Sequence, residues 1–126
     1  MTFEPIQAET LGLLEWPRLC EQLAGFAVTG LGRRAALGLQ PQAQQSLARR
    51  LLTETAEIGR LDQRQPGGLS FAGVADIGPA LERAERGGLL SGEELLQVAS
   101  TLAAVRQLRR LIEDAEDLPT LEELVA

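Results

Sequence analysis

One long apolar seam constrains the fold of this chain more than any other feature of its sequence. After Ser91, large aliphatic residues recur every three or four positions for about 20 residues, which is the spacing of an amphipathic helix and close to a heptad repeat. The seam consists of Leu95, Val98, Leu102, Val105, Leu108 and Ile112. A helix with such a face must bury it against another element. The sequence therefore predicts a long helix that is packed against a second one.

The start of this helix and its packing partner can both be predicted. Ser91 and Glu94 have the spacing of a capping box, in which each side chain accepts a hydrogen bond from the backbone N–H of the other residue. A second amphipathic pattern covers residues 43–65. Its apolar positions are Leu47, Leu51, Ile58 and Leu61. We expect these two long helices to pack against each other.

Composition predicts that the rest of the chain is also helical. With 24 leucines, 17 alanines, no tyrosine and 3% aromatic residues, the apolar residues favour helices over strands. Pro17 and Pro79 suit the first turn of a helix, Thr29 suits an N-cap, and the glycine-rich residues 66–74 suit an irregular connection. Short helices are expected at residues 8–15, 17–26, 30–39 and 81–86, with another beginning within 118–126. The predicted fold class is all-α, a helical core segment with two long packed helices and several short ones.

Length and residue usage limit the type of protein. A chain of 126 residues with a 44% apolar share suits one domain, and because it stops within residues 118–126, where a helix begins, we interpret it as a fragment of a longer protein. Cys20 has no partner for an internal disulfide. No basic and apolar leader and no run of about 18 apolar residues is found. We expect a cytoplasmic protein that has no membrane contact.

The residues needed for common catalytic sites are missing. Without histidine, and with a single cysteine, the chain cannot form the usual zinc sites or a nucleophile paired with histidine. All 12 basic residues are arginine, so a phosphate-binding loop that requires lysine is excluded. Residues 30–35 match a dinucleotide-binding fingerprint but follow a predicted helix rather than a strand. The carboxylates near residue 115 are typical of a solvated helix end. We expect no catalytic, cofactor-binding or metal site in this segment.

Three arginines are a weak candidate contact for nucleic acid. They lie within one turn of the long C-terminal helix and could together meet a phosphate. Glu113 and Asp114 follow two of them by four residues, which favours ion pairs within the helix instead. The net charge of −6 also opposes binding, unless Arg83 and Arg86 join the same patch. The three candidates are Arg106, Arg109 and Arg110.

Two stretches resemble the N-terminus of the second bacterial MutS paralogue family. The first extends from Leu-Leu-Glu-Trp at 13–16 to Thr-Gly-Leu-Gly-Arg at 29–33, and the second is Asp-Ile-Gly-Pro…Arg-Ala-Glu-Arg-Gly-Gly-Leu-Leu-Ser at 76–91. A long helix rich in alanine and serine then follows, as residues 97–102 illustrate. The resemblance covers nearly the whole chain in the order typical of that family. Gly78 departs from the pattern, because family members often have arginine there.

The resemblance implies a role within a larger protein. Residues 1–126 would be the N-terminal part of a MutS-like helical core and lever domain, followed by a clamp, an ATPase domain and usually a C-terminal Smr endonuclease domain. The parent would be an ATP-driven homodimer that binds branched DNA and suppresses homologous recombination. A second role attributed to the family is the splitting of collided ribosomes. ATP and Mg²⁺ would bind the parent, and its catalytic residues would lie beyond Ala126.

Three hypotheses therefore stand at this point. In the first, the segment is a mechanical lever whose long helices transmit ATPase-driven movement to the clamp. In the second, it is a free-standing helical module for dimerisation or protein interaction. In the third, which the net charge disfavours, it binds nucleic acid directly.

Overall fold

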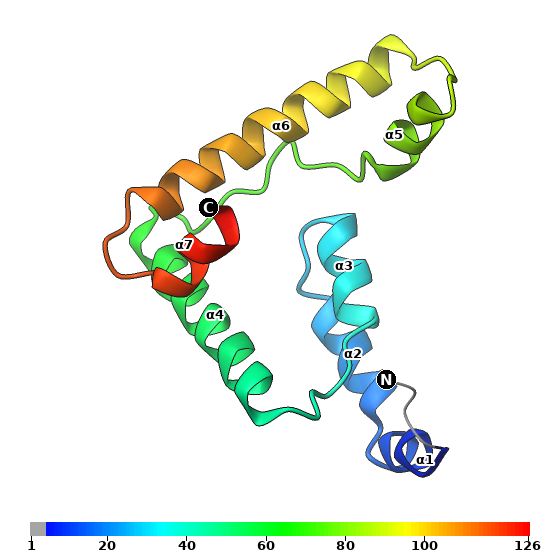
Figure 1. The fold of residues 1–126 in the computed structure, drawn as a ribbon, viewed down its shortest axis with the longest axis vertical. Helices are drawn as coiled ribbons and strands as arrows, with labels where there is room; N and C mark the ends of the chain where they lie inside the picture. Colours follow the sequence, from blue (N-terminus) through cyan, green and yellow to red (C-terminus); the bar gives the residue numbers. More distant parts are fainter. Residues whose placement is uncertain (1–4) are drawn as a thin grey trace. The chain divides into compact units, whose positions relative to one another are not determined.

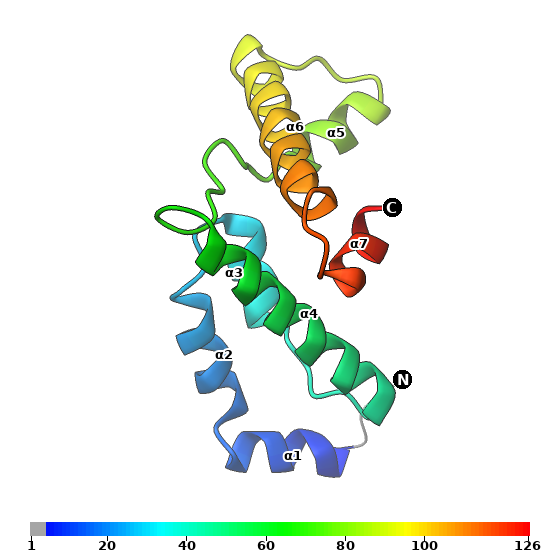
Figure 2. The same cartoon turned by 90° about the vertical axis from the view of Figure 1, so that its left-hand side faces the viewer.

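The computed structural model describes residues 5–126, and all of its regular secondary structure is α-helical (Figures 1 and 2). No strand occurs over this range, which confirms the predicted all-α class. The chain divides into two compact units, Met1–Gln40 and Pro41–Ala126. The helices are α1 (Pro5–Leu13), α2 (Trp16–Ala24), α3 (Gly30–Leu37), α4 (Gln45–Arg64), α5 (Gly78–Glu85), α6 (Gly92–Glu113) and α7 (Pro119–Val125).

In the first unit, α2 packs against α3 through small side chains, and α1 packs against α2. Cys20 and Ala24 are the buried residues of α2, and such small side chains allow the two helices to approach closely. Thr29 caps α3 as predicted, because its hydroxyl accepts from the N–H of Gly32 at 3.0 Å. The first unit is therefore a short helical hairpin with α1 attached.

The two apolar faces of α2 have different environments. Trp16 lies on the covered face, where its indole Nε1 donates to the carbonyl of Leu39 at 2.9 Å, and the Cys20 sulfur lies 3.7 Å from the same oxygen. These contacts attach the end of the α3 segment to α2. The adjoining face is exposed to solvent and consists of Leu19 and Leu23, with Phe26 just beyond the end of the helix. The larger apolar side chains of α2 therefore remain uncovered within this unit.

In the second unit, the core forms around α7. Leu61 of α4 and Leu118 and Leu121 of the α7 segment are buried together. Both α4 and α6 pack against α7, so this short helix connects the two long ones, as Figure 1 shows. Half-buried residues that complete the core are Ile58, Leu69, Leu111, Ile112 and Ala115.

The prediction that the two long helices pack directly against each other was wrong. Both helices are present, but they have little direct contact, and each packs mainly against α7. The apolar seam of α6 therefore enters the core only at its C-terminal end, through Ile112. Leu95, Leu102 and Val105 remain about half exposed. The physical reason is that α7 lies between the ends of the two helices and buries their apolar residues on itself.

The connection between α4 and α5 is held against the middle of α6 by Thr101. This buried threonine accepts from the N–H of Ala75 at 3.0 Å and donates to the carbonyl of Gly73 at 3.2 Å. Gly73 has a φ of +86°, and an added Cβ would lie 3.4 Å from the carbonyl oxygen of Ser100. The positive φ favours glycine at this position, whereas the added Cβ would make only an ordinary contact with the helix. The predicted irregular stretch is confirmed, and Thr101 fixes its position.

The start of α6 has the predicted capping box. The Ser91 hydroxyl accepts from the N–H of Glu94 at 3.2 Å, and the Glu94 carboxylate accepts from the N–H of Ser91 at 2.8 Å. Arg83 of α5 also forms an ion pair with Glu94. The Ser91 N–H and then Arg83 favour the charged carboxylate, and they hold the pKa of Glu94 below its ordinary value although partial burial opposes them. Glu94 thus stabilises the start of α6 and links it to α5.

Candidate functional site

The strongest structural feature of the second unit is a polar joint between α4 and α7. Glu57 of α4 is 1% exposed, and its carboxylate points to the N-terminus of α7. There it accepts from the N–H of Thr120 at 3.2 Å and from the N–H of Leu121 at 2.8 Å. The first amides of a helix have no partner within the helix, and they carry partial positive charge. A carboxylate from a distant helix therefore caps α7.

Opposing effects determine the pKa of Glu57. Burial raises it, because desolvation disfavours the charged form. The hydrogen bonds from Leu121 and Thr120, together with the positive charge of Arg60, lower it, and their sum is larger. The pKa of Glu57 consequently lies below its ordinary value, so the joint contains a charged carboxylate at neutral pH.

An ion pair beside the core fixes the turn that precedes α7. The Arg64 guanidinium binds both carboxylate oxygens of Asp117, each at 2.7 Å, and Arg60 donates to the Asp117 carbonyl at 3.3 Å. The hydrogen bonds from Arg64, and to a smaller extent its charge, lower the pKa of Asp117, although desolvation opposes them. At the other end of α7, Arg50 pairs with Glu123 at 3.2 Å. Three arginines of α4 thus hold the α7 segment.

Acid is expected to weaken this joint. The pKa values of Glu57 and Asp117 are lower in the folded than in the unfolded chain. Each carboxylate therefore stabilises the folded chain at pH values above its unfolded pKa, which is about 4. This stabilisation is lost as the pH falls through the folded pKa. The difference in free energy of unfolding between wild type and Asp117→Asn should therefore shrink between about pH 6 and pH 2. Urea unfolding at several pH values measures it. The control is the same substitution in an Arg64→Gln variant, where Asp117→Asn should change the free energy of unfolding little at any pH. If Asp117→Asn had the same effect at every pH in the otherwise wild-type chain, the ion pair would not be the cause of the lowered pKa.

The polar groups of the joint hold helices together. Every side-chain polar atom buried in the described part of the chain has a hydrogen-bond partner, which includes the carboxylate of Glu57. Each oxygen of this carboxylate accepts from one backbone N–H group of α7. The arrangement couples the orientation of α7 to α4, and through the shared core to the end of α6.

The structure places the three candidate arginines on the exposed surface of α6. Arg109 pairs with Glu113 at 2.6 Å, as predicted for residues four apart, whereas Arg106 and Arg110 form no ion pair with any residue of 5–126. Arg83 pairs with Glu94, 12 positions before Arg106, which corresponds to about 18 Å along a helix. Arg83 is therefore not part of one basic patch with them. Binding of nucleic acid by these arginines stays a prediction.

The acidic and glycine-rich motifs have structural positions in the described residues. Glu113 and Asp117 of the acidic stretch form ion pairs with Arg109 and Arg64. Over residues 5–126, no group of three metal-binding side chains is arranged to hold an ion. The Gly30–Ala35 fingerprint forms the start of α3, and it follows helix α2 rather than a strand. None of the described helices has the length and apolar character needed to cross a bilayer.

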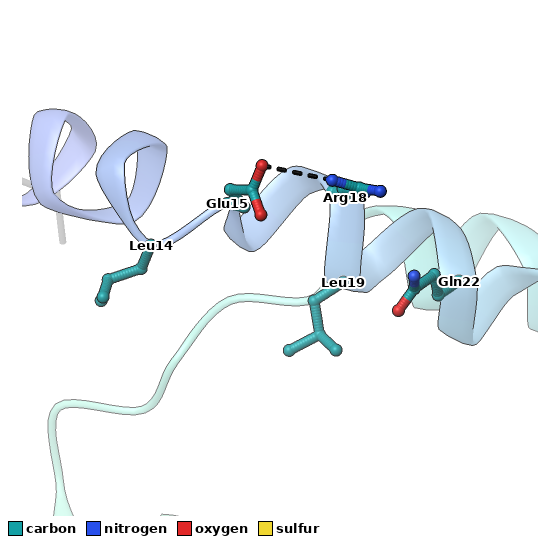
Figure 3. A pocket seen from close by; sticks show the side chains of 5 residues that line it. All are labelled: Leu14, Glu15, Arg18, Leu19 and Gln22. Atoms are coloured by element: carbon teal, nitrogen blue, oxygen red, sulfur yellow. Dashed lines mark hydrogen bonds and ion pairs between the residues drawn. The ribbon is translucent and has the colours of Figure 1, made fainter.

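A hollow at the turn between α1 and α2 was not predicted. It has a volume of about 270 Å³, it is open to solvent, and Figure 3 shows the side chains around it. Glu15 is left-handed at this turn, with φ 54°, which is unfavourable for a residue with a side chain. Pro17 starts the next helix and signals this break, although the predicted helix extended to residue 15. The hollow is lined by Leu14, Glu15, Arg18, Leu19 and Gln22.

The polar residues of this hollow are already paired. Glu15 and Arg18 form an ion pair at 3.4 Å, and their side chains are each 69% exposed (Figure 3). Exposed pairs of this kind contribute little to stability, and an open hollow with two leucines lacks converging polar groups that would orient a ligand. We therefore assign the hollow no chemical function.

The described residues form an all-α segment in which buried polar groups hold helices together. Comparison with known proteins gives the family. The chain is 49% identical over 121 residues to the endonuclease MutS2 of Synechocystis sp., a match that covers 96% of the chain. It is 41% identical over 107 residues (85% of the chain) to the endonuclease MutS2 of Geobacillus kaustophilus and 34% identical over 122 residues (94% of the chain) to a putative endonuclease MutS2 of Bacillus subtilis. The chain is homologous to MutS2 proteins, which confirms the resemblance found in the sequence.

The homology concerns only a small part of these relatives. The chain spans 15% of the length of the Synechocystis protein, 14% of the Geobacillus protein and 15% of the Bacillus protein. No protein-family model and no solved structure matches the chain. The name endonuclease therefore describes relatives that are about six times as long as this segment.

Proposed function

We propose that this chain is a helical scaffold and lever segment of a MutS2-type protein, a DNA-binding ATPase and endonuclease that suppresses homologous recombination. The observation that carries the proposal is the amount of large apolar surface that the segment leaves uncovered on both units. Phe26 is 84% exposed in the first unit, and Leu95 is 55% exposed in the second. Patches of this kind mark surfaces that bind other protein.

The relatives supply a reason for the exposed surface. Because they are much longer than the segment, the rest of such a polypeptide can cover faces that are bare here. The face formed by Leu19 and Leu23 on α2 and the seam of α6 would then be internal contacts of a larger helical core. The segment contributes packing surfaces and stiffness, and the catalytic groups belong to other domains.

The lever function is supported by the lengths of the helices and by the joint. With 20 and 22 residues, α4 and α6 are about 30 and about 33 Å long. Glu57 and Asp117 hold α7 against α4, and the core that α7 shares with α6 extends this rigid contact to the second helix. A displacement at the far end of one helix would therefore reorient the other.

The chemistry of the parent is part of the same proposal. ATP and Mg²⁺ would bind to its ATPase domain, and the endonuclease would belong to a C-terminal Smr domain. Two copies of the parent would form a homodimer in the cytoplasm. Arg106, Arg109 and Arg110 are the residues of this segment that could touch DNA or ribosomal RNA bound by the parent.

The proposal is tested with the full-length protein and with residues 1–126 in parallel. Binding to branched DNA and to stalled ribosomes is measured with ATP and with a non-hydrolysable analogue. We expect ATP-dependent binding by the full-length protein and none by the segment. Which of the two substrates is bound separates suppression of recombination from ribosome splitting.

Two outcomes would contradict the lever function. Binding of DNA or ribosomes by the segment alone, with a steep dependence on salt, would identify it as a direct nucleic-acid contact. A segment that forms a defined dimer and does not associate with the rest of the protein would identify it as a free-standing dimerisation module. Self-association that disappears when the remaining core is added would support the lever.

A further inference from the structure

One exposed face of α6 combines three apolar residues with one arginine. Residues spaced by four, three and four positions lie on the same face of a helix, within about 40° of its centre. All members of this group are exposed. They are Leu95, Ala99, Leu102 and Arg106, and we call this group the α6 stripe.

The α6 stripe is distinct from the face of α6 that the second unit covers. The connection before α5 covers α6 at Thr101, and the core covers Leu111 and Ile112. Leu95 is 55% exposed and Leu102 is 49% exposed, so two leucines one heptad apart face solvent. Such a spacing with a small residue between them is suited to the close approach of a second helix.

Arg106 adds a chemical requirement at one end of the stripe. It forms no ion pair with residues 5–126, whereas Arg109, three positions further along, is neutralised by Glu113. An arginine at the border of an apolar helix contact is favourable when a carboxylate of the partner faces it. The surface therefore fits a partner that is apolar opposite Leu95 and Leu102 and acidic opposite Arg106.

We infer that the α6 stripe is covered by an amphipathic helix from the rest of the same polypeptide, with its apolar positions on Leu95 and Leu102 and a carboxylate on Arg106. This inference rests on the proposed function, because it takes the segment as part of a longer MutS2-type chain. The relatives provide the required length, since the segment spans only about 15% of them.

Two other occupants fit the stripe less well. A nucleic-acid backbone offers phosphates to Arg106 but no apolar surface to Leu95 and Leu102. In a pair of α6 helices from two copies, the acidic residues of the first turn, Glu93 and Glu94, would have to face Arg106. Glu94 already accepts from Ser91 and pairs with Arg83, and Glu93 lies about 160° around the helix from the stripe.

The first test uses the absence of lysine in this segment. Arg106→Lys in the full-length protein introduces the single side-chain amine of residues 1–126, and a carbodiimide joins an amine to a carboxylate that touches it. Mass spectrometry then identifies the residue linked to position 106. We expect an aspartate or glutamate of the same polypeptide outside residues 1–126. A link between two copies, or no link at position 106 while lysines elsewhere react, would overturn the inference.

The second test measures burial of the stripe by thiol labelling. Ala99→Cys lies on the stripe, and Leu96→Cys lies on the same helix, about 100° from its centre, where the native leucine is 70% exposed. We expect labelling at position 99 to be at least about tenfold slower than at position 96 in the nucleotide-free full-length protein, and similar at both positions in dilute 1–126. Equal rates in the full-length protein overturn the inference. Protection that appears only with added DNA, or that grows with the concentration of 1–126, also overturns it.

The two proposals can fail separately. If position 99 is protected and position 106 is linked within the chain, but ATP does not affect nucleic-acid binding, the covering helix is correct and the lever is wrong. If binding depends on ATP while position 99 is labelled freely, the lever stands and the covering helix is wrong.

Discussion

Replacing Glu57 by alanine is expected to lower the free energy of unfolding of the second unit by about 2–4 kcal/mol, because two helix-terminal N–H groups lose their only acceptor in a buried position. The cost arises mainly from the two amides, which remain buried without a hydrogen-bond acceptor. The small apolar side chain of alanine can itself be buried in place of the carboxylate. Urea unfolding followed by far-UV circular dichroism is the measurement. Tryptophan fluorescence is unsuitable because the single tryptophan, Trp16, lies in the first unit.

A neighbouring glutamate provides the matched control. Glu54 lies three residues earlier on α4 and pairs with Arg50 at 3.2 Å, with 20% of its side chain exposed. Glu54→Ala should cost no more than about 1 kcal/mol, since an ion pair within a helix that is open to solvent is weak. Glu57→Gln should lie between the two, because its amide retains one acceptor oxygen. If Glu57→Ala and Glu54→Ala had equal effects, Glu57 would not be the cap of α7.

Truncation of Leu118 should have an effect of similar or larger size. Its side chain is fully buried against Leu61 and Leu121 at the point where α4, α6 and α7 meet. Leu118→Ala is expected to cost about 3–5 kcal/mol, which combines lost burial with a cavity that the short α7 segment cannot fill. This is a large part of the total stability of an ordinary domain. The change is measured as the shift of the urea midpoint at constant m-value.

Leu124 is the control for this substitution. It lies six residues further along, in α7, and is 58% exposed. Leu124→Ala should change the free energy of unfolding by less than about 1 kcal/mol, because little apolar area leaves contact. In the double variant Leu118→Ala/Glu57→Ala, the effects should be less than additive, since either change alone releases α7. Full additivity would show that the core and the cap stabilise α7 independently.

Together these contacts explain how a segment with few buried residues can hold two long helices. The buried apolar cluster is small, with Leu61, Leu118 and Leu121 at its centre. Glu57 and the ion pair of Asp117 with Arg64 determine the orientation of α7, because a helix cap and a bidentate ion pair each require a specific geometry. Such a joint is suited to transmit a rotation, which supports the lever that we propose.

Helix starts were the most predictable part of the structure. Thr29 and Ser91 cap the helices as expected, because capping depends on residues only three positions apart. The long helices over 45–64 and 92–113 also match their apolar periodicity. The ion pair of Arg109 with Glu113 was expected for the same reason, since it requires only helical geometry.

The joint could not be found in this way. Glu57 looks like an ordinary surface glutamate in the sequence, and its partners Thr120 and Leu121 lie more than 60 positions away. Periodicity also shows that Leu19 and Leu102 lie on apolar faces, but it cannot show whether anything covers them. In α2 the covered face includes the small residue Cys20, and in α6 it includes the polar residue Thr101.

The amino-acid sequence by itself determined the helices, their caps, the all-α class and the relationship to MutS2 proteins, because these depend on local spacing and on motifs. Only the tertiary structure decided that α7, rather than a direct contact between α4 and α6, joins the two long helices. It also decided that Glu57 is buried and that the α6 stripe is bare. The physical reason is that an apolar face favours burial, but its sequence pattern does not specify the partner. The partner depends on the lengths of the connections and on competition among all available surfaces.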